Sequence, residues 1–160
     1  QFKESSLLKV VESKNEKAVL ARIAEGDDVE TVRSDGSSML MVSVELEDLL
    51  LVKRWVKLGL DVNHQRTDGG TALFIAAQNG YDKIGAYLLS EGATPNIARN
   101  DGTTPLMVAI ENGNVGLVKK LIQSGASIQH ARDDGATVLS LAMKSGNYYL
   151  LRLLLSKGGG

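Results

Sequence analysis

The sequence has no cysteine and only two histidines and two prolines among its 160 residues. Without cysteine the chain can form no disulfide, and it offers neither a thiolate nucleophile nor a cysteine-based metal site. The absence of cysteine is compatible with the cytosol and equally with an oxidising compartment, where stray thiols are a hazard. It therefore excludes several kinds of chemistry but does not select a compartment.

Long apolar runs and an excess of charge of one sign are missing as well. The formal net charge is -1, which argues against a general nucleic-acid or membrane-surface binder, because such proteins are strongly basic. The longest apolar run, around residues 49–52, is far shorter than the ~18 residues of a membrane-spanning helix. We therefore expect neither nucleic acid nor membrane as a partner.

The chain does contain one pattern that recurs at a spacing of 33 residues. Residues 66–80 read RTDGGTALFIAAQNG, residues 99–113 read RNDGTTPLMVAIENG, and residues 132–146 read RDDGATVLSLAMKSG. Five columns stay in register: Arg33, Arg66, Arg99 and Arg132; Asp35, Asp68, Asp101 and Asp134; Gly36, Gly69, Gly102 and Gly135; Leu40, Leu73, Leu106 and Leu139; and Gly26, Gly59, Gly92, Gly125 and Gly158. Coincidence cannot hold five columns in register, so the repeat is real.

Within one unit the residue chemistry predicts a turn, a helix, a second turn and a second helix. Asp-Gly is a tight-turn signal, and the Thr71 that follows it is a natural N-cap. Apolar residues then recur at helical spacing near 71–79 and near 82–90, and Gly80 and Gly92 end these two helices. A single helix pair cannot bury both of its faces, so the units must stack into an all-α solenoid.

The string DGTTPLMVAIENG, followed by VGLVKKLIQSGA, resembles an ankyrin repeat. The resemblance spans essentially the whole chain and implies one ankyrin-repeat domain, residues 1–160, of stacked helix–turn–helix units with β-turn fingers. We expect the repeats at about 2–33, 34–66, 67–99, 100–132 and 133–160.

The sequence departs from the family at two kinds of position. The histidine that usually follows Thr-Pro-Leu is replaced in the four units by Met41, Phe74, Met107 and Ser140. Glu47 stands where the later units have Gly80, Gly113 and Gly146. These departures bear on local geometry and not on the fold.

Patterns typical of catalysis or metal binding are not found. His64 and His130 occupy equivalent positions two units apart, which is too far for them to share a metal ion. Asp133 and Asp134 are adjacent carboxylates, but they belong to a repeated turn. The glycine-rich turns lack the pattern of a phosphate-binding loop. We expect no catalytic residue, no metal site, no cofactor and no enzymatic activity.

In ankyrin proteins the concave surface, made of turn tips and first-helix ends, usually binds another folded protein. The resemblance therefore implies a non-catalytic protein-binding module, and we expect a monomer. Carried over by position, the partner-binding residues are Arg66, Asp68, Arg99, Asp101, Arg132 and Asp134 in the turns, Gln78, Asn79, Glu111, Asn112 and Lys144 at the first-helix ends, and Tyr81 and Tyr148 after the inter-helix glycines. Trp55 is in register with Leu88 and is expected in the core.

The arginine column has two interpretations, which the sequence leaves open. In the first, arginine–aspartate pairs staple neighbouring turns, although exposed pairs of this kind contribute only ~0–1 kcal/mol each. In the second, the arginines form a row that is presented to an acidic partner, since arginine makes bidentate contacts with carboxylates.

The resemblance extends to compact five-repeat bacterial proteins that bind an exported enzyme and protect the cell that makes it. It implies an inhibitor of an enzyme such as a cell-wall hydrolase. The start at Gln1, if it marks removal of a leader, favours the periplasm, and the cytoplasm is the alternative. The first alternative function is a cytosolic adaptor, and the second is a purely structural scaffold or an enzyme fragment.

Overall fold

A computed structural model describes residues 6–159, in which five helix pairs follow one another along the chain. Residues 1–5 and 160, which belong to the expected first and last repeats, lie outside the described residues. The helices are α1 Ser6–Glu12, α2 Glu16–Ala24, α3 Met39–Glu45, α4 Leu49–Lys57, α5 Ala72–Asn79, α6 Asp82–Ser90, α7 Pro105–Glu111, α8 Val115–Gln123, α9 Val138–Ser145 and α10 Tyr148–Leu154, followed by a π-helical turn η1 Leu155–Gly159.

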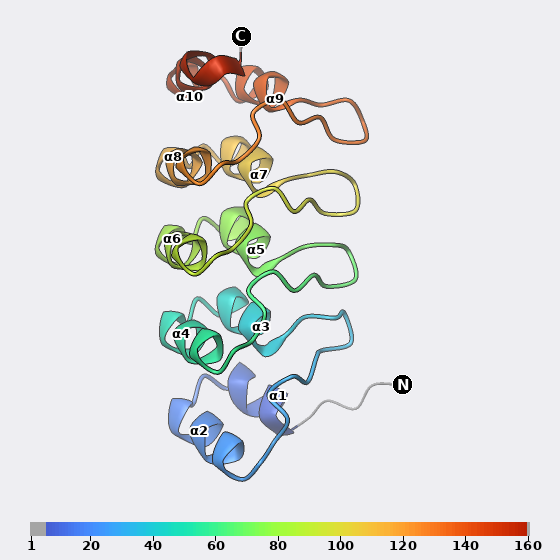
Figure 1. The fold of residues 1–160 in the computed structure, drawn as a ribbon, viewed down its shortest axis with the longest axis vertical. Coiled ribbons are helices and arrows are strands. Elements are labelled where there is room, and N and C mark those ends of the chain that lie inside the picture. Colours follow the sequence, from blue (N-terminus) through green and yellow to red (C-terminus); the bar gives the residue numbers. More distant parts are fainter. Residues whose placement is uncertain (1–5, 160) are drawn as a thin grey trace.

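The helix pairs are stacked on one another along the length of the molecule (Figure 1). The odd-numbered helices form one layer, in which each packs on the next, and the even-numbered helices form a second, outer layer. From the other side of the odd-numbered layer project four loops, which we call the fingers; their tips are residues 33–37, 66–70, 99–103 and 132–136. The described residues contain no strand, only two isolated bridges. The predicted all-α solenoid is confirmed.

Helix starts are set by capping side chains in nearly every unit. The odd-numbered helices α3, α5, α7 and α9 begin after Ser38, Thr71, Thr104 and Thr137, whose side chains accept a hydrogen bond from a backbone N–H of the first turn. The even-numbered helices α2, α4, α8 and α10 are capped in the same way by Asn15, Asp48, Asn114 and Asn147. Helix α6 is different, because Tyr81 stands at its N-cap and makes no capping hydrogen bond. A missing cap costs about 0.5–2 kcal/mol.

The turn between the two helices of a unit requires a left-handed backbone conformation. Gly80, Gly113 and Gly146 adopt it with φ of 75°, 69° and 71°. Lys14 and Glu47 stand at the same place in the earlier units, with φ of 60° and 56°. A side chain in this conformation costs roughly 1–2 kcal/mol, so Glu47 introduces strain where glycine forms the same turn elsewhere.

The core runs continuously through the stack. Leu40, Leu73 and Leu106 are at most 1% exposed, whereas the equivalent Leu139 of the last unit is only partly buried. Trp55 is fully buried and donates a hydrogen bond from Nε1 to Ser43 Oγ, at 2.8 Å. The expected core position of Trp55 is confirmed.

Three of the four residues at the family's histidine position also belong to the interior. Met41, Phe74 and Met107 are fully buried. Ser140 is exposed and completes a capping box with Thr137, because each side chain accepts a hydrogen bond from the other's backbone N–H. The position therefore serves packing in the middle of the stack and capping at its end.

The leucine column should contribute unequally to stability. Leu73→Ala or Leu106→Ala leaves a cavity between stacked units, and we expect a loss of ~2–5 kcal/mol in the free energy of unfolding. Leu139→Ala is the matched control and should lose clearly less, because Leu139 is only partly buried. Urea denaturation measures all three, and equal losses at the three positions would contradict the packing described.

Glycine at position 47 should stabilise the protein. Glu47→Gly relieves the left-handed strain at the cost of extra backbone freedom in the unfolded chain, so we expect a net gain of ~0.5–1 kcal/mol. Gly113→Ala should do the reverse, because a Cβ there would meet no atom within 4 Å and only backbone strain is added. Urea denaturation of both variants tests this, and a loss of stability in Glu47→Gly would refute it.

Candidate protein-binding surface

One aspartate holds each finger in shape, because its carboxylate accepts a hydrogen bond from a backbone N–H and forms an ion pair with an arginine. In the third unit, Asp68 accepts a hydrogen bond from the backbone N–H of Gly70 at 2.8 Å and an ion-paired one from Arg66 Nε at 3.0 Å. The same arginine–aspartate pair recurs in the other three fingers, as Arg33–Asp35 at 2.7 Å, Arg99–Asp101 at 2.7 Å and Arg132–Asp134 at 2.9 Å. The interpretation that these pairs staple neighbouring turns is wrong, because each pair lies within its own finger.

Neighbouring fingers are joined by their backbones. Thr67 N donates to Asp35 O at 2.9 Å, and the same bond recurs from Asn100 N to Asp68 O at 2.8 Å and from Asp133 N to Asp101 O at 3.0 Å. At Gly69 the next finger comes so close that a Cβ would lie 2.9 Å from Asn100 N. The turn requires glycine in all four fingers, and the contact with the next finger adds to this requirement at Gly36, Gly69 and Gly102 but not at Gly135.

The two histidines reinforce this stacking. Nε2 of His64 lies 2.7 Å from Gly36 O, and Nε2 of His130 lies 2.7 Å from Gly102 O. A carbonyl oxygen can only accept, so Nε2 carries the proton and donates in both. Among residues 6–159, no three metal-ligating side chains come together to hold a metal ion.

Two of the arginines also reach the end of a first helix in the preceding unit. Arg66 Nη1 lies 3.4 Å from Glu45 Oε1, and Arg132 Nη1 lies 3.4 Å from Glu111 Oε1. In both cases the glutamate precedes the arginine by 21 residues in the chain. These pairs link the base of a finger to the odd-numbered layer. The repeat positions place Glu45 and Glu111 at first-helix ends but do not predict that they pair with these arginines.

Arg99 lacks such a helix-end carboxylate. The residue 21 positions before Arg99 is Gln78, so the column of first-helix-end residues that includes Glu45 and Glu111 is neutral at this point. Among the described residues Asp101 is its one ion-pair partner, and its guanidinium lies over the ring of Phe74, 5.1 Å from the centroid. Its side chain is 30% exposed, against 16% for Arg66. Arg99 is therefore the least paired arginine of the row.

The finger carboxylates are strongly biased towards the charged form. Hydrogen bonds from Arg33 and Arg99 hold the pKa values of Asp35 and Asp101 well below their usual range, and Arg132 lowers the pKa of Asp134. At Asp68, partial burial raises the pKa, but hydrogen bonds from Arg66 and from the backbone of Gly70 outweigh it, and the net shift is downward.

The predicted residues at the first-helix ends come together in two groups. Asn112 Nδ2 donates to Ala77 O at 3.2 Å and to Gln78 O at 2.9 Å, which ties α7 to the exposed end of α5, where Asn79 also lies. Glu111, paired with Arg132, and Lys144 both line a small hollow of about 210 Å³. The fingers and the first-helix ends thus form one surface, which we call the finger surface.

The two predicted tyrosines are placed differently from each other. Tyr148 is 76% exposed at the first residue of α10, in the outer layer. Tyr81 is half-buried and packs against the core at the start of α6. The structure therefore does not place them side by side in one patch.

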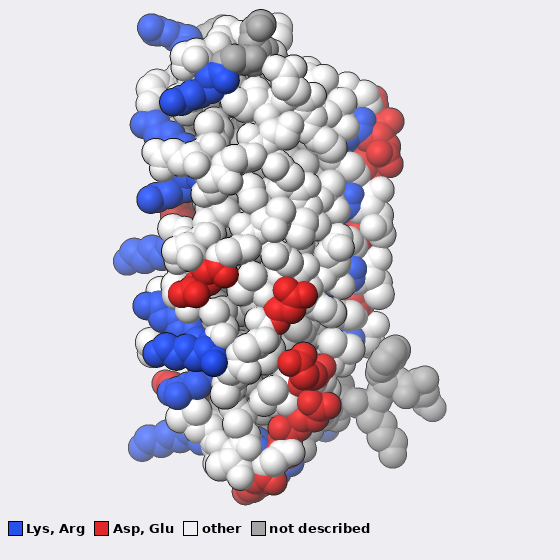
Figure 2. Space-filling view, in the orientation of Figure 1, with Lys and Arg blue, Asp and Glu red and all other residues white. Residues whose placement is uncertain are grey.

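The outer layer has a different charge from the finger surface. Lysines and arginines gather along the edge formed by the even-numbered helices (Figure 2). The exposed basic residues of these helices are Lys17, Lys53, Arg54, Lys57, Lys83, Lys119, Lys120 and Arg152. On the fingers, by contrast, every arginine is paired with an acid. None of the described helices is long and apolar enough to cross a membrane.

The lowered aspartate pKa values predict a protein that is destabilised by acid. A carboxyl group whose pKa is lowered by folding stabilises the fold above its unfolded pKa of ~3.9, and this contribution is lost as the pH falls through the folded pKa. We expect the free energy of unfolding to fall steadily below about pH 4. Asp101→Asn can keep the turn hydrogen bond but not the charge, so its decline should be shallower. Urea denaturation between about pH 2 and 7 measures this, and an unchanged decline in Asp101→Asn would contradict it.

Comparison with known proteins agrees with the repeating geometry. The family model described as ankyrin repeats (three copies) matches residues 7–99 and again residues 87–159. No curated protein is similar enough in sequence to match the chain. Ankyrin repeats are generally protein-interaction modules. With helix pairs stacked in register, fingers bonded to one another and a family match over nearly its whole length, the chain belongs to the ankyrin-repeat family.

Proposed function

We propose that the protein binds a folded protein partner through the finger surface. The residues proposed to contact the partner are those of the fingers, Arg66, Asp68, Arg99, Asp101, Arg132 and Asp134, and those of the first-helix ends, Gln78, Asn79, Glu111, Asn112 and Lys144, with Tyr81 at the edge. Tyr148 is a weaker candidate, because it projects from the outer layer.

The observation that carries this proposal is the incomplete pairing of Arg99. In the fingers on either side, the equivalent arginine is shared between an aspartate of the finger and a glutamate of a first helix. At Arg99 the helix position holds neutral Gln78, and Nη1 donates no hydrogen bond to any residue that the structure describes. A guanidinium can donate five hydrogen bonds in a planar fork, so Arg99 is ready to receive a carboxylate from a partner.

The surroundings of Arg99 suit a protein and not a phosphate backbone. Asp68 and Asp101 flank it at the finger tips, and fixed negative charges of this kind repel a polyanion. The surface beside it carries the exposed amides of Gln78, Asn79 and Asn112. Amides and a single available guanidinium match the mixed donors and acceptors of a protein surface.

As the role of this binding, we propose inhibition of an enzyme, such as an exported bacterial cell-wall hydrolase. The support is the resemblance to small ankyrin proteins of that kind. A cytosolic adaptor or scaffold remains the second candidate. Stoichiometric addition of the protein to the captured partner separates the two, since an inhibitor abolishes the partner's activity and an adaptor leaves it intact.

Arg99 and Arg66 should respond differently to the same substitution. Arg99→Gln should weaken binding of a captured partner about tenfold or more, because a charge-assisted hydrogen bond is lost, with little change in stability. Arg66→Gln should lower the free energy of unfolding by ~1–2 kcal/mol, because Asp68 loses its ion-pair partner and Glu45 loses one of its two. Lys53→Ala, in the outer layer, is the control and should bind normally. Partner capture followed by calorimetry measures these affinities, and full binding by Arg99→Gln would refute the docking role.

The reverse experiment supplies the missing carboxylate from within the chain. Gln78→Glu places a glutamate where Glu45 and Glu111 stand, so Arg99 should pair with it and become unavailable. We expect a stability equal to or above that of the parent protein, together with weaker partner binding. Binding that is unchanged while stability rises would show that the partner does not use Arg99.

A further inference from the structure

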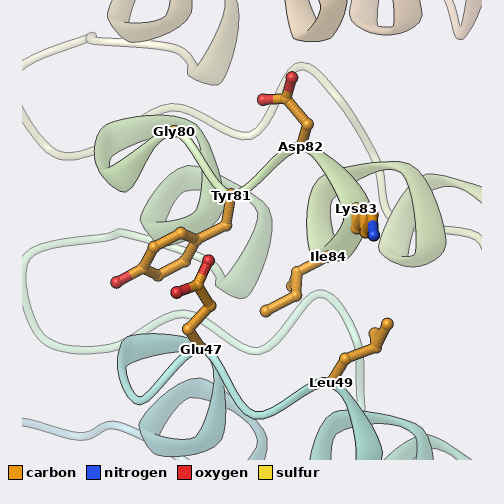
Figure 3. Close-up of a pocket in the computed structure, with 7 residues that line it drawn as sticks. All are labelled: Glu47, Leu49, Gly80, Tyr81, Asp82, Lys83 and Ile84. Atoms are coloured by element: carbon orange, nitrogen blue, oxygen red, sulfur yellow. The ribbon is translucent and has the colours of Figure 1, made fainter.

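A cavity of about 510 Å³ lies between the α3–α4 turn and the α5–α6 turn, beside the first-helix ends. Glu47 and Leu49 line it from one unit, and the segment from Gly80 to Ile84 lines it from the next. Figure 3 shows the side chain of Glu47 pointing up towards the α5–α6 turn, which carries Tyr81, with Leu49 and Ile84 on the other side of this space. The cavity thus has a carboxylate and an aromatic ring at one end, and the aliphatic side chains together with Lys83 at the other.

Both residues at the polar end depart from the repeat, and both departures reduce stability. Glu47 adopts a left-handed conformation that glycine adopts at the equivalent turn of the three later units. Tyr81 stands at a helix N-cap where Asn15, Asp48, Asn114 and Asn147 make a capping hydrogen bond that tyrosine does not make. Lys14 has the same left-handed conformation in the first unit but has no aromatic residue opposite it, so this conformation alone does not indicate a binding site. The two departures line the same cavity. Among the described residues, this is the one place where an acid at the inter-helix turn of one unit is combined with an aromatic residue at the N-cap position of the next.

The carboxylate of Glu47 is also free. It makes no hydrogen bond or ion pair with any residue that the structure describes, in contrast to Glu45, which pairs with Arg33 and Arg66. Asp82, the other acid of the cavity wall, points away from Glu47 and accepts a hydrogen bond from Asn114 of the next unit. One free carboxylate is too few to hold a metal ion such as Ca²⁺, which takes 6–8 oxygen ligands.

We propose that this cavity binds one arginine side chain of a protein partner. The guanidinium would pair with the Glu47 carboxylate and stack on the face of Tyr81, since arginine combines bidentate carboxylate contacts with stacking on aromatic rings. Its aliphatic stem would lie against Leu49 and Ile84. This proposal rests on the proposed function in one respect, that the arginine belongs to a protein partner. The cavity itself is lined by residues of this chain alone, so it can be tested without the partner.

The test uses the free amino-acid derivative, so it needs no partner. The parent protein is titrated with N-acetyl-arginine amide, N-acetyl-lysine amide and the neutral isostere N-acetyl-citrulline amide, and backbone amide shifts are followed by NMR. Saturable shifts are expected at Glu47, Gly80 and Tyr81. The arginine derivative should bind at least ~fivefold more tightly than citrulline, because a cation–π contact and a charge-assisted hydrogen bond each contribute a factor of a few. Equal binding of citrulline or lysine would overturn the assignment.

Two variants test the site without unfolding the protein. Glu47→Gly restores the glycine of the other units, so it should raise Tm by about 2–4 °C and reduce arginine binding to the level of citrulline. Tyr81→Asn restores the capping residue and should weaken arginine binding likewise, whereas Tyr81→Phe keeps the ring and should bind as the parent does. Undiminished binding by Glu47→Gly would overturn the proposal.

Three controls separate this site from the finger surface and from general charge. Glu30→Gln removes an exposed acid that does not line the cavity and should leave binding unchanged. Lys83→Ala removes the cation of the cavity wall and should not weaken binding. Arg99→Gln should bind the arginine derivative normally even though it loses the partner. If Glu30→Gln weakens binding as much as Glu47→Gly, the derivative is responding to net charge and the proposal fails.

Discussion

No helix pair in this chain can be stable alone, and the rest of the structure follows from that constraint. The helices have seven to nine residues each, whereas isolated helices shorter than ~12–15 residues are marginal in water. Each pair is stable only because neighbours cover its faces. The same types of side chain must therefore recur at equivalent positions of each unit, which explains the leucine, threonine and glycine columns. Because packing imposes this repeat, a residue that departs from it can be recognised by comparison with the other units.

Three departures in the middle of the stack replace a residue that supports the turn, cap or ion pair at the equivalent position of a neighbouring unit. Gln78 leaves Arg99 without a helix-end acid, Glu47 strains a turn that glycine makes freely, and Tyr81 leaves a helix start uncapped. All three reduce stability or fail to add it, although the alternative residue occurs at the same position of a neighbouring unit. Selection for stability alone would remove them. Their grouping at the junction of the second, third and fourth units is what favours a binding role there.

The sequence predicted those parts of the structure that depend on local chemistry. The caps at Thr71 and Thr104, the second helix near 82–90 and the buried position of Trp55 follow from turn, capping and periodicity rules that act over a few residues. The ion-pair partners of the arginines could not be predicted from such local rules. Arg66 meets Glu45 across 21 residues of chain, and which acid a long side chain reaches depends on how one unit is rotated on the next. The column spacing alone could not separate a pair within a finger from a pair between fingers. The cavity beside Glu47 was missed for the same reason, since its walls come from two units.

The two surfaces of the solenoid divide the charge in a way that suits the proposed binding. Arginine and aspartate neutralise one another within each finger. The fingers therefore produce little long-range electrostatic field, and their charged groups act mainly on atoms in direct contact. The outer layer carries exposed lysines with few acids among them, and such a field acts over about a Debye length, ~8–10 Å at physiological salt. A field from that side can orient an approaching acidic protein, whereas in the proposed binding the choice of partner depends on charged groups that are not fully paired within the chain. Arg99 is available to accept a carboxylate and Glu47 is available to accept a cation. The two groups have opposite charge and come from different units. A partner that used both, as proposed, would have to present both charges at a fixed separation, so the stacking of the units would contribute to specificity.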